Sequence, residues 1–486
     1  MYDAIVIGAG IAGIAVALRL KKRGDKVLVL EKNSYVGGKM NQYESMGYRW
    51  DTGPSLFTMP QLVDELYELY DKNPIDYYQY KEEEEACRYF FSDKTQLNFY
   101  TNRTKLKKEL SEKLGIDTKV IDSYMERSAE KYNSIGVISL ENAIHKPSGL
   151  PWGKLLKMLP QIFRTNLFTS LHRLNATQLK EPRLVQIFDR YATYNGSNPY
   201  KASGILSMIP HLEQNVGTFF PKGGMRSIVD GLYQLAKEVG IEFEFGVSID
   251  KVEKIKKGYC INENPHYHCK RLVSAIDCVQ FYKEVLKDKT LAKKYHRQER
   301  SSSAIIFYWG IQKQFAELGL HNIFFSEDYQ REFELIFEEK NIPLEGTIYV
   351  HISSKVNPQD APQDGENWFV MLNVPAGIEI NKEQTAIIKS AILKRIEQML
   401  NKEVTPYIQT EKVWTPKGIE LDTGAIEGAL YGAASNSKMA ALTRHPNFSK
   451  KYKEIYFCGG TVHPGGGIPL SIQSAKIVDK LIANER

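Results

Sequence analysis

Cysteine is scarce in this chain of 486 residues. The five cysteines are odd in number and include no C-x-x-C pair; they are Cys87, Cys260, Cys269, Cys278 and Cys458. This usage argues against a disulfide framework and a cysteine-based metal centre, and it is typical of a reducing compartment. We therefore expect no metal site and no structural disulfide.

Long uninterrupted apolar runs are lacking too. A membrane-spanning helix needs about 18–20 consecutive apolar residues, and no stretch of this sequence reaches that length. The most apolar stretch, residues 4–20, is interrupted by three glycines. The N-terminus also lacks a positively charged leader. We expect a cytoplasmic protein that does not span a membrane.

Neither sign of charge is in large excess. The 64 Lys and Arg residues exceed the 58 Asp and Glu residues by only six, which gives a net charge of +6. Charge this diffuse does not indicate nucleic-acid binding, and we expect no nucleic-acid partner. Hydrophobic residues make up 42% of the chain, which suits a globular protein long enough for two or three domains.

The first forty residues carry the most informative pattern. Residues 3–7 form a short apolar run, typical of a buried parallel strand. In the G-x-G-x-x-G pattern that follows, Gly8 permits a tight turn, Gly10 lets the backbone approach a pyrophosphate, and Gly13 lets a helix pack closely. The helix expected over residues 14–22 offers its N-terminal N–H groups to phosphates. The pattern predicts a dinucleotide site.

An acidic residue ends the second predicted strand, residues 26–30. Glu31 lies 18 residues after Gly13, where a carboxylate accepts the hydroxyls of a ribose. A glycine-rich turn in an unrelated domain would leave this carboxylate unexplained. Glu31 therefore strengthens the prediction of a dinucleotide site, although it does not separate NAD from FAD.

Later segments indicate a second, interleaved part of the fold. Strand patterns at residues 302–311, 321–325, 346–353 and 367–373 predict an antiparallel sheet with one buried face, and residues 381–402 predict a helix.

Other segments return to the nucleotide-binding part. Residues 51–55 are a turn of small residues where backbone can approach a flat ring. Residues 225–239 predict an amphipathic helix, and residues 248–255 and 270–277 predict strands. The closing strand, glycine-rich loop and helix over residues 456–483 place a second helix N-terminus near a cofactor.

Residues 148–175 are distinctive because they are basic and amphipathic. Apolar and aromatic side chains alternate with Lys154, Lys157, Arg164 and Arg173, and no acidic residue is present. Such a stretch can lie in a bilayer interface, with its cations near anionic headgroups. A helix pair packed on its own domain is the alternative. We hypothesise that this segment attaches the protein peripherally to the inner face of the membrane and admits a lipid-soluble substrate.

The motifs together resemble the carotenoid (phytoene) desaturase family of the flavin amine-oxidase-like superfamily. The matching stretches are GAGIAG, VGGKM, DTGPS, FPKGGM, LVSAID, HNIFFSEDY and FCGGTVHPGGGIP, which occur in the family's order from residue 3 to about residue 480. Within the family, DTGPSLFTMP and HNIFFSEDY are more similar to hydroxycarotenoid 3,4-desaturases than to the first phytoene enzymes.

The resemblance implies an α/β fold. A discontinuous Rossmann-like FAD-binding domain would accompany an α+β substrate domain with an antiparallel sheet and a helical membrane-contact region. The FAD-binding domain would comprise residues 1–72, 215–290 and 416–486, and the substrate and membrane-contact domain residues 73–214 and 291–415.

The resemblance also implies non-covalently bound FAD. Lys39, beside a second glycine pair, would face the phosphates, and Ile249 would present its backbone to the adenine. Gly460 would lie by the phosphate or ribitol, and Ile468 and Pro469 would approach the isoalloxazine ring. The predicted cofactor contacts are Gly8, Gly10, Gly13, Glu31, Lys32, Gly37, Gly38, Lys39, Gly53, Pro54, Ser55, Ile249, Gly460, Ile468 and Pro469.

One departure from related flavoproteins concerns the ribitol chain. They often carry an acidic residue after the late glycine, whereas Thr461 stands here. We assign no catalytic residue: His463 is expected to shape the flavin loop through a hydrogen bond, and Asp51 and Asp277 are expected to be turn or cap residues.

The function implied is an FAD-dependent carotenoid desaturase that introduces a C=C bond into a C40-type carotenoid. The subfamily resemblance favours 3,4-desaturation of a hydroxylated or monocyclic carotenoid, such as one like 1'-hydroxy-gamma-carotene. Alternatives on the same fold are a phytoene- or diapophytoene-type desaturase and a carotenoid isomerase or oxygenase. A non-enzymatic prenyl-lipid escort and an amine oxidase are the other classes, and no aromatic cage of an amine oxidase is located in the sequence. Oxygen or a quinone would be the electron acceptor.

Overall fold

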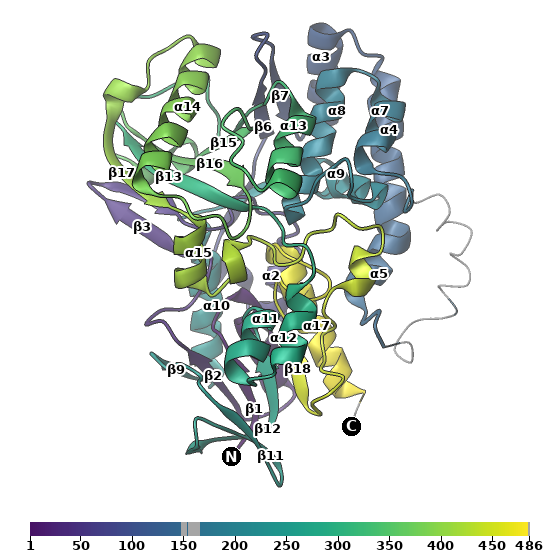
Figure 1. Ribbon diagram of the computed structural model, residues 1–486, viewed down its shortest axis with the longest axis vertical. Coiled ribbons are helices and arrows are strands. Elements are labelled where there is room, and N and C mark those ends of the chain that lie inside the picture. Colours follow the sequence, from purple (N-terminus) through teal and green to yellow (C-terminus); the bar gives the residue numbers. More distant parts are fainter. Residues whose placement is uncertain (147–152, 154–165, 485–486) are drawn as a thin grey trace.

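The computed structural model describes residues 1–146, 153 and 166–484. Figure 1 shows two stacked parts, each built around one large sheet. The lower part holds both the N-terminal strand and the C-terminal helix, so the ends of the chain belong to the same part.

The lower sheet has the strand order β10-β11-β12-β1-β2-β9, with β18 also paired to β12. The parallel strands are β1 (Tyr2–Ile7), β2 (Val27–Glu31), β9 (Glu242–Phe245), β12 (Asn264–Ser274) and β18 (Ile455–Phe457). β10 (Val252–Ile255) and β11 (Gly258–Ile261) extend it in antiparallel fashion. The predicted Rossmann-like α/β architecture is confirmed.

Three helices cover one face of this sheet and form a core with it. α1 (Ile11–Lys22) is buried along Ile11–Leu20, since it lies between the sheet, α10 (Arg226–Glu238) and α17 (Ile468–Ala483). A helix that is apolar nearly all round is stable only when it is enclosed in this way. α2 (Gln61–Glu68) adds Leu62, Val63 and Leu66 to the same core.

The upper sheet has the order β17-β13-β16-β15-β14-β6-β7. Its strands are β6 (Glu85–Phe90), β7 (Gln96–Tyr100), β13 (Ser303–Ile311), β14 (His321–Phe324), β15 (Ile348–Ile352), β16 (Glu366–Val374) and β17 (Ile408–Trp414). The pairing is antiparallel except between β14 and β6, so the sheet is mixed.

The expectation of a single buried face is wrong for this sheet. All nine residues of β13 are buried. One face, with Phe307 and Trp309, packs under α14 (Lys382–Leu400) through Ile388 and Ile392. The opposite face is covered as well, because it is turned toward the lower part of the molecule and lines an internal cavity.

Two small sheets and a group of helices complete the fold. β3 (Gln42–Ser45) pairs with β4 (Tyr48–Asp51), and β5 (Tyr80–Glu82) pairs with β8 (Phe219–Pro221). The helices beside the upper sheet are α3 (Arg103–Leu114), α4 (Thr118–Lys131), α7 (Leu171–Leu179), α8 (Pro182–Asp189) and α13 (Tyr329–Glu334). Gly115, in the left-handed conformation, ends α3 and separates it from α4.

The structure differs from one predicted strand and describes only part of the basic segment. The strand predicted over residues 248–255 begins only at Val252, because residues 247–250 run along the cavity. The basic segment 148–175 lies largely outside the described residues, although α7 begins within it at Leu171. Among the described residues, no helix is long and apolar enough to cross a bilayer. The predicted domain boundaries stay predictions.

Candidate cofactor site

A cavity of about 840 Å³ lies between the two parts, at the upper end of the usual range for ligand pockets. It begins at the carboxyl ends of β1 and β2 and continues to the inner face of the upper sheet. Every residue predicted to contact the cofactor lines this cavity except Gly13. The cavity therefore joins motifs that are more than 400 residues apart in the sequence, from Gly8 to Pro469.

The three glycines of the first motif have different structural roles. Gly8 has a φ of 99°, which favours glycine, and its N–H donates to the Leu30 carbonyl at 2.8 Å. A Cβ on Gly13 would lie 1.9 Å from the Gly8 carbonyl oxygen, so this glycine permits the helix to pack on the turn. A Cβ on Gly10 would meet nothing within 4 Å. Gly10 therefore leaves space in the cavity, directly before the N-terminus of α1.

Glu31 is held in place by the backbone at the end of β2. Its carboxylate accepts hydrogen bonds from the N–H of Ala9 at 2.8 Å and of Asn33 at 2.9 Å. These bonds fix the carboxylate beside the glycine turn, where it lines the cavity together with Lys32. Each carboxylate oxygen has a further lone pair with which to accept a hydroxyl group.

The second glycine pair and the 51–55 turn pack together. Gly37 has a φ of 112° and donates its N–H to the Ala9 carbonyl at 2.9 Å, which joins the pair to the first motif. A Cβ on Gly53 would lie 1.9 Å from the Lys39 carbonyl oxygen. Only glycine permits this approach, and it places Pro54 and Ser55 in the cavity wall.

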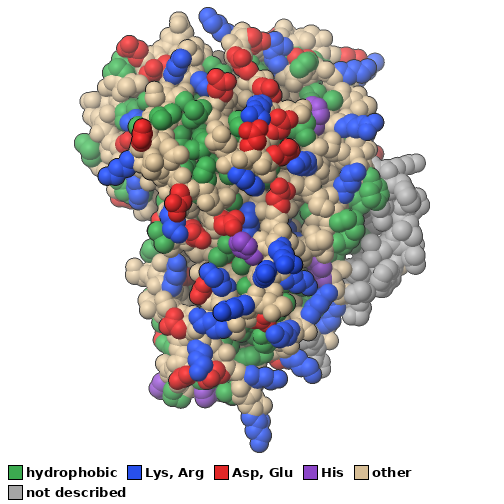
Figure 2. Space-filling view, viewed as in Figure 1, with side chains coloured by type: hydrophobic (Ala, Val, Ile, Leu, Met, Phe, Trp, Pro, Cys, Tyr) green, Lys and Arg blue, Asp and Glu red, His purple; other side chains and the backbone are tan. Residues whose placement is uncertain are grey.

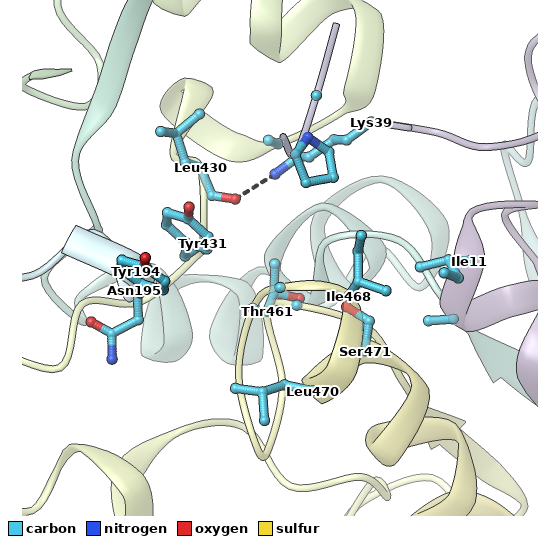
Figure 3. Close-up of a pocket in the computed structure, with 18 of the residues that line it drawn as sticks. Ile11, Lys39, Tyr194, Asn195, Leu430, Tyr431, Thr461, Ile468, Leu470 and Ser471 are labelled. Carbon is cyan, nitrogen blue, oxygen red and sulfur yellow. Dashed lines mark hydrogen bonds between the residues drawn. The ribbon is translucent and has the colours of Figure 1, made fainter. Parts of the chain in front are cut away.

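Among the cations of the cavity wall, Lys39 and Arg444 donate to backbone carbonyls and not to carboxylates of the described residues. Lys39 Nζ donates to the Leu430 carbonyl at 2.7 Å, as Figure 3 shows, and Arg444 donates to the carbonyl of Ala433 at 2.8 Å. Neither forms an ion pair within the described part of the chain. Burial lowers the pKa of Lys39 to about 8 and that of Arg444 to about 10. An anionic ligand would offset this loss of hydration.

The late loop completes the cavity at the start of α17. Gly460, Ile468 and Pro469 all line it, and Figure 3 shows Ile468 in the first turn of this helix. A Cβ on Gly466 would lie 2.6 Å from Cδ1 of Tyr431, so this glycine lets the tyrosine ring lie against the loop.

The departure at Thr461 is visible in the structure. The Thr461 hydroxyl accepts the N–H of Cys278 at 3.2 Å and so joins the late loop to the end of β12. Asp277 caps the short helix there by accepting the N–H of Val279 at 2.8 Å. This capping role was predicted from the sequence and is confirmed.

The remaining acid–base candidates also have structural roles. Asp51 accepts the N–H of Met225 at 2.9 Å at the start of α10 and pairs with Arg49 at 2.8 Å. His463 lines the cavity, its Nε2 lies 3.0 Å from the Asn142 carbonyl oxygen, and burial lowers its pKa to about 4. The predicted hydrogen bond of His463 is therefore present, and its ring is neutral at physiological pH.

Several cavity residues were not found from the sequence. Ile249 was predicted to line the site. Six other cavity-lining residues were not predicted: Arg190, Tyr194, His321, Tyr349, Phe369 and Tyr431. Most lie on strands or short helices without a recognisable motif. Strand register, which the sequence does not reveal, brings His321, Tyr349 and Phe369 to one face of the upper sheet. Arg190 and Tyr194 reach the cavity from a short helix, and Tyr431 reaches it from a loop.

The residues present fit a dinucleotide with a flat ring. The open space at Gly10 adjoins the N-terminus of a twelve-residue helix, where backbone N–H groups attract phosphate. Glu31 supplies acceptors for a ribose, and the positive charges of Lys39 and Arg444 in the cavity wall favour an anion.

Comparisons with known proteins agree with this fit. The family described as "Flavin containing amine oxidoreductase" matches residues 11–478. A 1-hydroxycarotenoid 3,4-desaturase from Flavobacterium sp. (strain P99-3) is 44% identical, over 100% of this chain and 99% of the relative. A 4,4'-diaponeurosporene oxygenase from Staphylococcus aureus (strain MSSA476) is 28% identical, over 99% and 98%.

A solved structure shares the fold over its full length. Cyclohexylamine oxidase from Brevibacterium oxydans IH-35A has a TM-score of 0.62 at 14% identity, over 100% of this chain and 99% of the other. The family resemblance drawn from the motifs is confirmed. FAD is the cofactor, because the family is flavin-containing and the residues of the cavity fit a dinucleotide. This chain belongs to the flavin-containing amine oxidoreductase family.

Proposed function

We propose that this protein is an FAD-dependent carotenoid desaturase that forms the 3,4 double bond of a hydroxylated carotenoid. The observation that carries the proposal is 44% identity over the whole chain to a 1-hydroxycarotenoid 3,4-desaturase. The cavity supports it, because one continuous space joins the predicted flavin contacts to the inner face of the upper sheet. That face supplies apolar side chains such as Ile306, Ile323 and Phe369.

Desaturation removes two hydrogens from adjacent carbons. Bound FAD supplies the hydride acceptor. The protein must hold the polyene beside the flavin and exclude water. The enclosed apolar face of the upper sheet supplies the side chains for both tasks. One hydrogen leaves as a hydride from the allylic carbon, because the conjugated system delocalises the cation left behind. The other leaves as a proton from the adjacent carbon, and the neighbouring cation makes this C–H acidic enough for a weak base to accept the proton. No strong base is therefore required, which agrees with the low pKa of the buried His463 and with the capping hydrogen bond that Asp277 accepts.

The proposal is tested by an absorption spectrum under anaerobic conditions. Purified protein loaded with FAD is mixed with a 1-hydroxycarotenoid, and both chromophores are followed. We expect the flavin bands to bleach while the carotenoid bands move to longer wavelength. A colourless protein that also fails to take up added FAD would instead support the lipid-escort function.

A carotenoid oxygenase is the second candidate. Relatives named 4,4'-diaponeurosporene oxygenase are 27–28% identical over nearly the full chain. Mass spectrometry of the product separates the two reactions, because desaturation removes two hydrogens and oxygenation adds oxygen.

We also propose that the protein lies peripherally on a membrane, where it takes up its substrate. Phe168, Met439 and Leu442 are 66%, 46% and 52% exposed. The neighbouring Leu167 and Ala441 line the cavity, so the exposed apolar side chains adjoin one end of it. Figure 2 shows hydrophobic side chains on the surface beside the grey residues, in the region where Figure 1 places α5 (Val137–Glu141).

Liposome co-sedimentation tests this second proposal. Changing Phe168, Met439 and Leu442 together to serine should reduce binding to anionic vesicles by about 10-fold or more, because apolar insertion drives interfacial binding. Ile387→Ser is the matched control, since Ile387 is 50% exposed on α14 in the upper part of the molecule. Equal binding by the triple variant and this control would contradict membrane contact at this surface.

A further inference from the structure

One place on the inner face of the upper sheet is polar. In the register of β14 and β15, His321 lies opposite His351 and Ile323 lies opposite Tyr349. These four residues share one face of the sheet, because alternate residues of a strand point the same way. His321 and Tyr349 line the cavity on that face, next to the apolar Ile323 and Phe369.

A chain of hydrogen bonds crosses the cavity wall here. The Tyr349 hydroxyl lies 2.6 Å from Oγ of Ser55 and 2.8 Å from Nδ1 of His321. Ser55 belongs to the turn after β4, on the side of the predicted flavin contacts, and it lines the cavity too. The three side chains therefore connect that turn to the upper sheet.

The end of this chain is unsatisfied. Nε2 of His321 is buried and has no hydrogen-bond partner among the described residues, and the side chain is only 4% exposed. Burial holds the pKa of His321 well below its usual value, and the charges of His351 and Arg190 lower it further. A neutral ring carries one N–H and one bare nitrogen, so Nε2 can donate to or accept from a hydroxyl group. Nε2 itself is enclosed by protein atoms, so a ligand in the cavity reaches this chain of hydrogen bonds through Tyr349 and Ser55, which line the cavity and whose oxygens can accept a further hydrogen bond.

We propose that Ser55, Tyr349 and His321 form the site that binds the hydroxyl group of the carotenoid substrate. This inference rests on the proposed function and adds the residues that select the substrate. In a 1-hydroxycarotenoid desaturated between carbons 3 and 4, the hydroxyl-bearing carbon is only two carbons from the nearer reacting carbon. The hydroxyl must then lie beside the flavin contacts. Ser55 meets this requirement, because it lies in the turn of small residues that is predicted to approach the flat ring, and this turn lines the cavity.

The competing explanation is that the Ser55–Tyr349 bond only fastens the turn to the sheet. The chain offers a matched control for that role. The Tyr308 hydroxyl donates to the Thr52 carbonyl at 3.1 Å, so it also joins the same turn to the same sheet. Tyr308 is buried and is not part of the cavity lining. Tyr308→Phe thus removes a fastening bond without touching the proposed hydroxyl site.

The test measures binding of two carotenoids that differ only in the hydroxyl group. FAD-loaded protein in detergent micelles is titrated with a 1-hydroxycarotenoid and with its counterpart that lacks the hydroxyl, and quenching of tryptophan fluorescence gives each affinity. The native protein should prefer the hydroxylated carotenoid by about 10- to 100-fold, as one or two hydrogen bonds in a buried site require. Tyr349→Phe and His321→Phe should each reduce this ratio toward one, and Tyr308→Phe should leave it unchanged.

Equal affinities in the native protein would overturn the inference, and so would the same loss of preference in Tyr308→Phe. A fall in both affinities by one factor in Tyr349→Phe would also overturn it, because that result marks a structural role. Product is analysed in the same samples. Absence of desaturation with either carotenoid would contradict the proposed function alone, since the affinity ratio is measured without turnover.

Discussion

Replacing Gly10 with valine should abolish FAD binding and leave the fold intact. The backbone of Gly10 is extended, with φ −71° and ψ 173°, and a Cβ there would meet no atom within 4 Å. The valine side chain can therefore be accommodated, but it would fill the space before the N-terminus of α1. Loss of two hydrogen bonds to charged phosphate, at about 1.5–3 kcal/mol each, would raise the Kd for FAD by roughly 100- to 10,000-fold.

The assay is a titration of the apoprotein with FAD, followed by quenching of flavin fluorescence. Thermal unfolding of the apoprotein gives the control value. Valine is a poorer residue than glycine before a helix, by about 1 kcal/mol, so we expect the Tm of the apoprotein to fall by no more than about 4 °C. A variant that binds FAD with native affinity would refute the placement of the pyrophosphate at this turn.

Gly13→Ala provides the contrasting variant. Its Cβ would lie 1.9 Å from the Gly8 carbonyl oxygen, which is backbone and cannot move away freely. We expect a large loss of apoprotein stability from this smaller substitution. The opposite order, with Gly13→Ala stable and Gly10→Val unfolded, would contradict the division of roles between the two glycines.

The remaining predictions concern other parts of the cavity wall. Burial lowers the pKa of Lys39 from 10.5 to about 8, so the unfolded chain binds more protons between those pH values. The free energy of unfolding of the apoprotein should then rise by up to about 3 kcal/mol from pH 8 to 10.5, as measured by urea unfolding. The Lys39→Met variant should lack this rise with pH. Asp51→Ala should lower the free energy of unfolding by about 1.5–3 kcal/mol in the same assay, because Arg49 loses its 2.8 Å partner and keeps only the longer 3.4 Å pair with Asp360. A loss below about 0.5 kcal/mol would contradict a stabilising role for the Arg49–Asp51 pair. Gly466→Ala should displace the ring of Tyr431, which lies 2.6 Å from the new Cβ, and a flavin spectrum and carotenoid affinity identical to native would contradict that contact.

Local chemistry explains why the nucleotide-binding half could be predicted. A glycine that needs a positive φ, a glycine that meets a carbonyl oxygen, and an acidic residue at a strand end are determined within thirty residues of chain. The structure places all three together, with Glu31 bonded to the N–H of Ala9. The burial of the upper sheet could not be predicted the same way. Its second face is buried by a part of the molecule that is distant in sequence. The alternation of apolar and polar residues along a strand does not reveal burial by such a distant part.

The far wall of the cavity was missed for a related reason. Tyr349 and His321 meet because β14 and β15 pair in one register, and a shift of one strand by one residue would turn its side chain to the opposite face of the sheet. Tyr431 lies in a loop without periodicity and reaches the site through contact with Gly466. Lys39 was predicted to face the phosphates, and that role stays a prediction. The hydrogen bond of Lys39 to the Leu430 carbonyl was not predicted from the sequence.

The order of strands in the lower sheet has a consequence for biosynthesis. β1 pairs with β12, and β12 pairs with β18, so the first and last strands are brought together through one that lies midway along the chain. Contacts of such long sequence separation form slowly, because a large loop must close before they are gained. The glycine turn is among the first segments to leave the ribosome, and the loop that faces it across the cavity is among the last. Flavin loading must therefore follow the release of nearly the whole chain, and a polypeptide that stops before β18 should accumulate without cofactor.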